Sequence, residues 1–104
     1  MKILVVGGGG REHAIASALA RNRKTVIYSV MAKKNPGISK LANKVLLCRE
    51  TDVPRIVAFA QENSIEYAFI GPESPLEAGI VDALESVNIP VSYTHLTLPT
   101  TERV

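Results

Sequence analysis

The stretch that determines the fold is Ile3-Leu4-Val5-Val6-Gly7-Gly8-Gly9-Gly10-Arg11-Glu12-His13. A short apolar run ends at four consecutive glycines, and apolar residues at helical spacing begin directly afterwards. This order predicts a buried strand, a tight turn and a helix. Glycine lacks a Cβ, so a ligand can lie against the bare backbone of such a turn. The first amides of a helix have no intrahelical partners, which makes the turn a candidate site for an anion such as phosphate.

The composition is typical of one small globular domain. Of the 104 residues, 46% are apolar and 21% are charged, and the net charge is only +2. The basic residues are scattered, so no nucleic-acid partner is expected. The single cysteine, Cys48, excludes an internal disulfide, and its apolar neighbours favour a structural thiol over a nucleophile. No apolar stretch reaches the ~20 residues of a membrane span. There is no signal peptide either, so we expect a cytoplasmic protein without a membrane partner.

Strands are expected to alternate with helices along the chain. The apolar runs predict strands at 2–6, 25–30, 45–48 and 67–70, and a fifth that begins at 89–91. Helices are expected at about 11–21, 53–63 and 75–87, with one helical turn at 38–41; the first should bury Ala14, Ile15, Ala18 and Leu19. We therefore predict an α/β Rossmann-like domain, a parallel sheet of about five strands with helices on both faces. Ligands of such sheets bind beyond the carboxyl ends of the strands.

The glycine turn does not match the known nucleotide fingerprints. In a G-x-G-x-x-G motif that starts at Gly7 or Gly8, the third glycine would fall on Glu12 or His13. The second strand ends in Ser29-Val30, where a dinucleotide site needs an acid for the ribose. No Gly-Lys-Ser/Thr follows the glycines, so an ATP P-loop is absent. The turn binds another kind of anion, or it is a purely structural turn.

Arg11, Glu12 and His13 begin the first predicted helix. Arg11 can clamp a phosphate with two hydrogen bonds. Glu12 either contacts the ligand or complements the helix dipole in the first turn. His13 is more typical of a residue that anchors a helix start to a neighbouring loop than of a catalyst. With the other histidine far away in the C-terminal segment, no metal site is expected.

Two further loops should lie at the same edge of the sheet. Gly71-Pro72-Glu73 follows the fourth strand, and its rigid turn would hold Glu73 at the rim, where the carboxylate accepts hydrogen bonds from sugar hydroxyls or an amine. A solvated turn residue is the alternative for Glu73. After it, Ser74 and Glu77 can form a capping box. Asn35-Pro36-Gly37 follows the second strand and is a turn that forms a possible wall of the site.

The segment 91–104 does not continue this pattern. It has no helical period and no apolar run to complete the fifth strand. Back-translated, Val91 to about Thr101 resembles the transposon-end adapter used in sequencing libraries. We therefore expect a native domain at 1–90 and a non-native, adapter-derived tail at 91–104, with a longer natural protein. A naturally flexible C-terminus is the alternative.

Taken together, three motifs resemble the phosphoribosylamine–glycine ligase family. They are Gly8-Gly9-Gly10-Arg11-Glu12-His13-Ala14, Asn35-Pro36-Gly37, and Gly71-Pro72-Glu73-Ser74-Pro75-Leu76 with Gly79 and Asp82. The resemblance covers residues 1 to about 90. The Asn-Pro-Gly-Ile form resembles the archaeal branch of the family.

The resemblance implies an enzyme that joins 5-phosphoribosylamine to glycine, cleaves ATP to ADP and phosphate, and uses Mg²⁺ or Mn²⁺. This chain would be the N-terminal, pre-ATP-grasp domain of that ligase. The backbone at Gly8–Arg11 would then lie against the ribose phosphate, and Glu73 would hold the ribose hydroxyls or the amine. The catalytic residues would lie in later domains, so we expect this chain to bind neither ATP nor metal and to lack ligase activity.

Two other interpretations remain. A stand-alone Rossmann-like module that binds a sugar phosphate or nucleotide explains the same turn without catalysis. A nicotinamide-dependent reductase is disfavoured by the missing third glycine and the missing acid on the second strand.

Overall fold

A parallel sheet forms the centre of the computed structural model, which describes residues 1–71, 75–76 and 78–93. Its strand order is β3-β2-β1-β4-β5, with every pair parallel. The strands are β1 (Lys2–Val6), β2 (Val26–Met31), β3 (Ala42–Leu47), β4 (Tyr67–Ile70) and β5 (Val91–Tyr93). The helices are α1 (Gly10–Ala20), α2 (Pro36–Leu41), α3 (Val53–Glu62) and α5 (Ile80–Glu85). The predicted Rossmann-like α/β class is confirmed.

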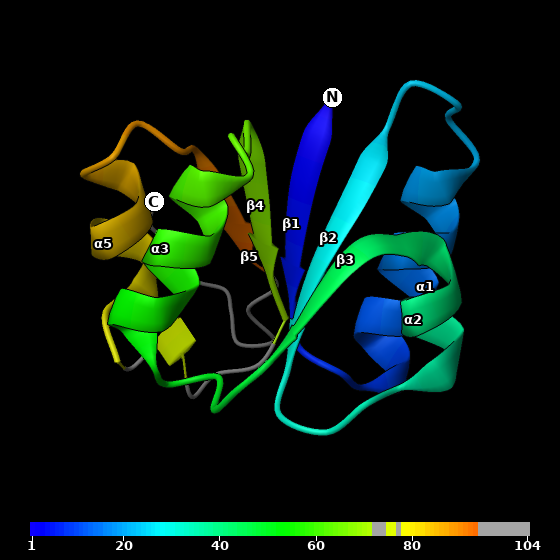
Figure 1. Cartoon of the computed structure of the whole chain (residues 1–104), viewed down its shortest axis with the longest axis horizontal. Helices are drawn as coiled ribbons and strands as arrows, with labels where there is room; N and C mark the ends of the chain where they lie inside the picture. Colours follow the sequence, from blue (N-terminus) through cyan, green and yellow to red (C-terminus); the bar gives the residue numbers. More distant parts are fainter. Residues whose placement is uncertain (72–74, 77, 94–104) are drawn as a thin grey trace, which may run out of the picture.

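The helices form two layers, one on each face of the sheet. Figure 1 shows α1 and α2 on one side and α3 and α5 on the other. The side chains of β1 alternate between them. Leu4 and Val6 belong to the core beneath α3 and α5, whereas Ile3 and Val5 pack with Ala16 of α1. These four side chains are buried, because β1 has a neighbouring strand on each side and a helical layer on each face.

The buried face of α1 differs from the prediction. Ala14 and Ala18 are exposed, and Glu12 and Ala16 are the buried residues of this helix. Alanines occur on several sides of α1, so apolar spacing alone could not identify its inner face. The deciding feature is the tight turn before the helix, which directs Glu12 inward. Ala16, one turn later, then lies on the same face.

Three element boundaries also differ from the sequence prediction. The predicted helical turn at 38–41 is a six-residue helix, α2, and β3 starts at Ala42 rather than Val45. Pro75 and Leu76 are helical, as expected, but the helix predicted from about 75 to 87 is not continuous: residues 78–79 form a turn, and α5 begins at Ile80, after Gly79 with a φ of +89°. The predicted cap residues Ser74 and Glu77 lie outside the described residues. The fifth strand, β5, includes three residues of the segment expected to be non-native.

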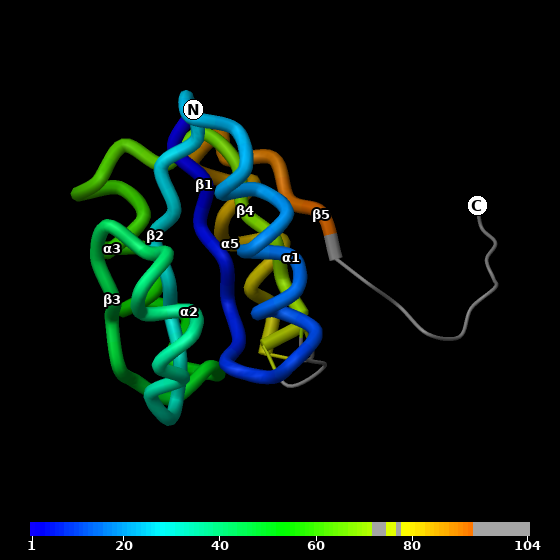
Figure 2. The backbone as a smooth tube through the Cα atoms, turned by 90° about the vertical axis from the view of Figure 1, so that its right-hand side faces the viewer, coloured from blue at the N-terminus to red at the C-terminus, as the bar shows by residue number. Residues whose placement is uncertain are grey.

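The loops that follow the parallel strands meet at one edge of the sheet, the lower end in Figures 1 and 2. Register places Val6 opposite both Val30 and Ile70. Backbone hydrogen bonds continue this pairing beyond β1: Gly7 N–H donates to Val30 O at 2.8 Å, and Gly71 N–H donates to Val6 O at 3.1 Å. The glycine turn therefore lies between the β2 and β4 loops. Across the described part of the chain, no helix has both the length and the apolar character to cross a membrane.

Candidate functional site

The glycine turn changes the direction of the chain between β1 and α1. Gly7 has a φ of +123°, a region that L side chains rarely adopt, so this position requires glycine. Gly9 is the N-cap of α1, and its carbonyl accepts the hydrogen bond from His13 N–H at 3.0 Å. The turn therefore delivers the start of α1 to the edge of the sheet.

The Glu12 side chain is enclosed by three glycines. It is only 6% exposed, and its Oε1 accepts a hydrogen bond from Gly9 N–H at 2.8 Å. A Cβ at Gly71 would lie 2.1 Å from Glu12 Oε2, and a Cβ at Gly7 would lie 2.7 Å from Glu12 Cγ. Bare backbone at Gly7 and Gly71 is thus what makes room for this carboxylate. Glu12 ties the β1 turn to the end of β4, a role that local sequence does not show.

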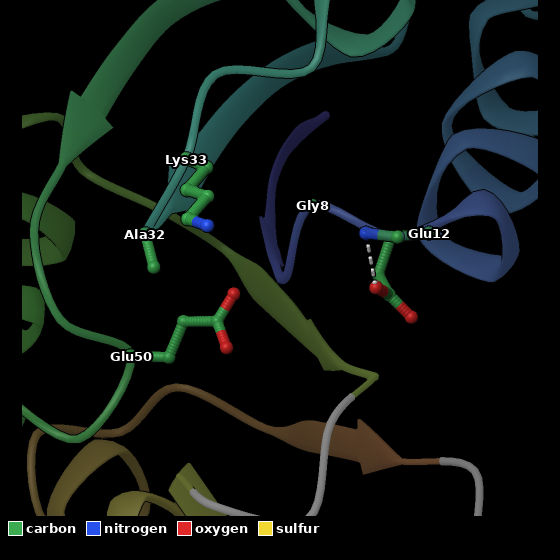
Figure 3. Close-up of a pocket in the computed structure, with 6 residues that line it drawn as sticks. Gly8, Glu12, Ala32, Lys33 and Glu50 are labelled. Atoms are coloured by element: carbon green, nitrogen blue, oxygen red, sulfur yellow. Dashed lines mark hydrogen bonds between the residues drawn. The ribbon is translucent and has the colours of Figure 1, made fainter.

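A pocket of about 350 Å³ opens beside the turn. Figure 3 shows it between the end of β1, the loop after β2 and the loop after β3. Its lining comes from all three segments: Gly8, Gly9, Glu12, Ala32, Lys33 and Glu50. The sequence predicted Gly8, Gly9 and Glu12 as site residues, and the structure brings these three together here.

Glu50 is a pocket residue that the sequence analysis missed. Burial and the negative charge of Glu12 raise the pKa of the Glu50 carboxyl, and hydrogen bonds from the backbone amides of Ala32 and Gly8 lower it. Figure 3 shows the Glu50 side chain extending from its loop toward Gly8. The available signal was positional: an acid two residues after a predicted strand belongs to the sheet edge where ligands bind.

The Asn35 loop is attached to the glycine turn. Asn35 Nδ2 donates to Gly8 O at 2.9 Å, and Asn35 Oδ1 accepts from Gly37 N–H at 2.9 Å and Ile38 N–H at 3.3 Å. The same side chain therefore caps α2 and holds the turn. Pro36 occupies the first turn of α2 and is exposed.

His13 contacts this same loop. A Cβ at Gly37 would lie 2.6 Å from His13 Nε2, so the imidazole packs directly on the backbone of that glycine. The contact joins α1 to α2. It agrees with the interpretation of His13 as an anchor between the helix start and a loop.

The other residues that the sequence predicted for the site, where the structure describes them, do not line this pocket. Gly10 begins α1, and a Cβ there would meet nothing within 4 Å. Arg11 is exposed in the first turn of α1. Pro72 and Glu73 lie outside the described residues. Among the residues that the structure describes, no group of three or more His, Cys, Asp and Glu side chains could hold a metal ion.

Comparison with curated proteins finds close relatives over most of this chain. Phosphoribosylamine–glycine ligase of Methanocorpusculum labreanum is 61% identical over 89 residues, and that of Methanoregula boonei shows the same identity over the same length. The ligase of Methanothermobacter thermautotrophicus is 60% identical over 91 residues. Each match covers 86% of this chain but only 20–21% of the relative. The chain thus spans about a fifth of the length of these curated relatives.

Solved structures share the fold at low sequence identity. A structure described as glycinamide-RNase-transformylase T from Mycobacterium tuberculosis aligns with a TM-score of 0.66 at 15% identity, over 89% of this chain and 26% of that one. N5-carboxyaminoimidazole ribonucleotide synthetase from Thermotoga maritima aligns with a TM-score of 0.65 at 13% identity, over 86% of this chain and 24% of that one. At these identities the likeness supports the fold alone.

Family assignment rests on a match over nearly the whole chain. The family model described as "Phosphoribosylglycinamide synthetase, N domain" matches residues 1–94. That range includes the glycine turn, the Asn35 loop and the complete sheet. The chain therefore belongs to the phosphoribosylglycinamide synthetase N-domain family.

Proposed function

We propose that this chain is the N-terminal substrate-binding domain of a phosphoribosylamine–glycine ligase. The complete enzyme would join the amine of 5-phosphoribosylamine to the glycine carboxylate and cleave ATP to ADP and phosphate. The names of the relatives and the N-domain match support this activity. The proposed ligase acts in the cytoplasm on small molecules and has no nucleic-acid or membrane partner.

The observation that carries the proposal is the position of the α1 start beside the pocket. An α-helix leaves its first amides without intrahelical partners and carries partial positive charge at that end. Gly10, where α1 begins, offers bare backbone with no neighbour within 4 Å of a Cβ position. The exposed Arg11 adds a guanidinium to the same turn. We assign the phosphate of phosphoribosylamine to Gly10 and Arg11, with Gly9 and His13 holding the turn and the Asn35–Gly37 loop as a wall.

The Gly71-Pro72-Glu73 turn completes the proposed substrate site. Gly71 already contacts the Glu12 carboxylate at the end of β4, beside the glycine turn. A carboxylate at Glu73 would accept hydrogen bonds from the sugar hydroxyls or the amine of the substrate. We retain Glu73 and Pro72 as proposed binding residues on their place in the motif.

The charges of the pocket residues do not fit the polyphosphate of ATP. Two carboxylates, Glu12 and Glu50, line it beside one ammonium, that of Lys33, so a polyphosphate would meet net repulsion. Glu12 is also already bonded to the Gly9 amide. We assign ATP and Mg²⁺ (or Mn²⁺) to the full-length enzyme, and we expect residues 1–104 to show no glycine-dependent ADP release above background. Release above background would overturn that assignment.

Calorimetry with charge variants at Gly10 tests phosphate binding. Ribose 5-phosphate should bind the 104-residue protein, and NAD should not. Gly10→Glu has room for its side chain and complements the helix dipole, so the fold should persist. Its carboxylate should nevertheless repel the phosphate and weaken binding by about tenfold or more, whereas Gly10→Gln, of the same shape without charge, should bind more nearly like the wild type. NAD binding, or equal affinity in both variants, would contradict the proposal.

We also propose that residues 1–90 are the native domain and that 91–104 derive from a sequencing adapter. The lack of periodicity after Val91 and its back-translation support this division. Recovering the locus by a method without transposon adapters tests it. An in-phase ligase reading frame after residue 90 would support both the division and the proposed enzyme. The same codons in genuine flanking sequence would refute the division and favour a stand-alone sugar-phosphate module.

A further inference from the structure

We propose that Glu50 binds the ribose hydroxyls of the substrate and that the pocket beside Gly8 is the sugar subsite. This inference rests on the proposed function, which supplies a phosphoribosyl ligand. It adds a binding residue that none of the three sequence motifs contains. Glu50 comes from the loop after β3, a segment outside those motifs.

The geometry holds the Glu50 carboxylate at the pocket in a defined orientation. The backbone amides of Ala32 and Gly8, from the loops after β2 and β1, act on this carboxylate and lower its pKa. In Figure 3 the Glu50 side chain extends from its own loop toward Gly8, and the pocket lining comes from the loops after β1, β2 and β3. A carboxylate has about four lone-pair positions, which gives Glu50 acceptor capacity for ligand hydroxyls.

The charges around the pocket favour a neutral hydrogen-bond donor over a second anion. Glu12 and Glu50 are close enough for the charge of one to raise the pKa of the other. Lys33 is exposed, so water screens its ammonium, and it only partly offsets the two carboxylates. Sugar hydroxyls can donate to Glu50 without adding negative charge. A phosphate would add negative charge to the pocket, so it is better placed at the start of α1.

The size of the pocket fits a single sugar. Small-ligand sites span about 300–1,000 Å³, and this pocket, at about 350 Å³, is at the lower end of that range. Gly8 and Gly9 are at once pocket residues and neighbours of the α1 start. A ligand with its phosphate at Gly10 and Arg11 can therefore place its ring beside Glu50.

The test compares two sugar phosphates that differ by one hydroxyl. Affinities of ribose 5-phosphate, 2-deoxyribose 5-phosphate and inorganic phosphate are measured by calorimetry on the wild type, Glu50→Gln and Glu66→Gln. Glu66 is an exposed carboxylate before β4, at the opposite edge of the sheet, and serves as the matched control. A hydroxyl bonded to a carboxylate should give the wild type and Glu66→Gln about a tenfold preference for ribose 5-phosphate over the deoxy sugar.

Glu50→Gln should reduce this preference to about twofold or less and leave affinity for inorganic phosphate unchanged or higher. The glutamine carbonyl can still accept the Gly8 and Ala32 amides, so thermal unfolding should change little. If this variant fails to fold, Glu50→Asp, with a shorter reach, should show the same loss of preference.

Each contrary outcome has its own meaning. If Glu50→Gln keeps the preference for ribose 5-phosphate over the deoxy sugar, the sugar subsite alone is overturned. The same holds if the wild type binds ribose 5-phosphate but shows no such preference. A loss of phosphate affinity in Lys33→Ala would place the phosphate in this pocket and also overturn it. No binding of ribose 5-phosphate to the wild type would overturn the proposed function together with this inference.

Discussion

Two carboxylates flank the same glycine turn, and their surroundings are opposite. Glu12 is enclosed, with one oxygen bonded to Gly9 N–H and the other against the backbone of Gly71. Glu50 lines an open pocket of about 350 Å³. Residue type does not separate them, since both are glutamates beside the turn. The difference is that backbone fills the space around Glu12, whereas three loops diverge around Glu50.

This difference assigns separate tasks to the two sides of the turn. On the Glu12 side, any added atom displaces a side chain that joins β1 to β4. On the Glu50 side, the open pocket leaves space that a ligand can occupy. Mutations on the first side should therefore change stability, and mutations on the second should change binding.

The largest expected effect is at Gly71. The Cβ of Gly71→Ala would lie 2.1 Å from Glu12 Oε2 and would drive that carboxylate out of its enclosure. We expect a loss of about 3 kcal/mol in the free energy of unfolding, measured by urea denaturation. Gly10→Ala, whose Cβ meets nothing within 4 Å, is the matched control and should be neutral or slightly stabilising.

A double mutant identifies the cause of that loss. Glu12→Ala removes the obstructing side chain, so Gly71→Ala should cost less than about 1 kcal/mol in the Glu12→Ala background, a strongly non-additive result. Equal costs in both backgrounds would mean that the strain at Gly71 does not involve Glu12.

Substitution of Asn35 should cause the next largest loss in the free energy of unfolding, because this side chain supports the glycine turn. Asn35→Ala removes the cap of α2 and the Nδ2 bond to Gly8 O, so we expect a loss of about 2 kcal/mol. Asn35→Asp keeps the capping oxygen but loses the donor to Gly8, and should cost about half as much. Hydrogen exchange at the Gly37 and Ile38 amides should accelerate in Asn35→Ala and much less in Asn35→Asp. Equal acceleration would show that the cap is not what protects these amides.

The smallest effect concerns the pH dependence of stability at Glu50. Its pKa in the folded protein is raised above the ordinary value of 4.5, so the native state holds this proton more tightly than the unfolded chain. Stability of the wild type relative to Glu50→Gln should therefore fall as pH rises from about 4.5 through the raised pKa, and then level off. The charged group that acts on this titration is Glu12, whose negative charge raises the pKa of Glu50. A difference that increases with pH would have the wrong sign and contradict the assignment.

Sequence patterns predicted the sheet and the glycine turn at its edge well, because both depend on local signals. The apolar run of β1 and the glycines after it are visible in a few consecutive residues. The burial of Glu12 was not predictable in this way, since it depends on Gly71, which is distant in sequence. The role of Glu50 depends on amides from two other loops. Likewise, the turn that separates α5 from the helical residues Pro75 and Leu76 includes Gly79, whose left-handed conformation the sequence pattern did not show.

The central position of β1 has a consequence for how the domain folds. Ile3 pairs with Ile27 on one side and with Tyr67 on the other, so the first strand made gains its second neighbour only after β4 has been made. Such non-local parallel pairing is slow to form, because a long loop must close before any contact compensates for its entropy. During synthesis the glycine turn therefore has one open flank until β4 emerges. We expect the turn to reach its final geometry late in folding, after the β1–α1–β2 unit has already assembled.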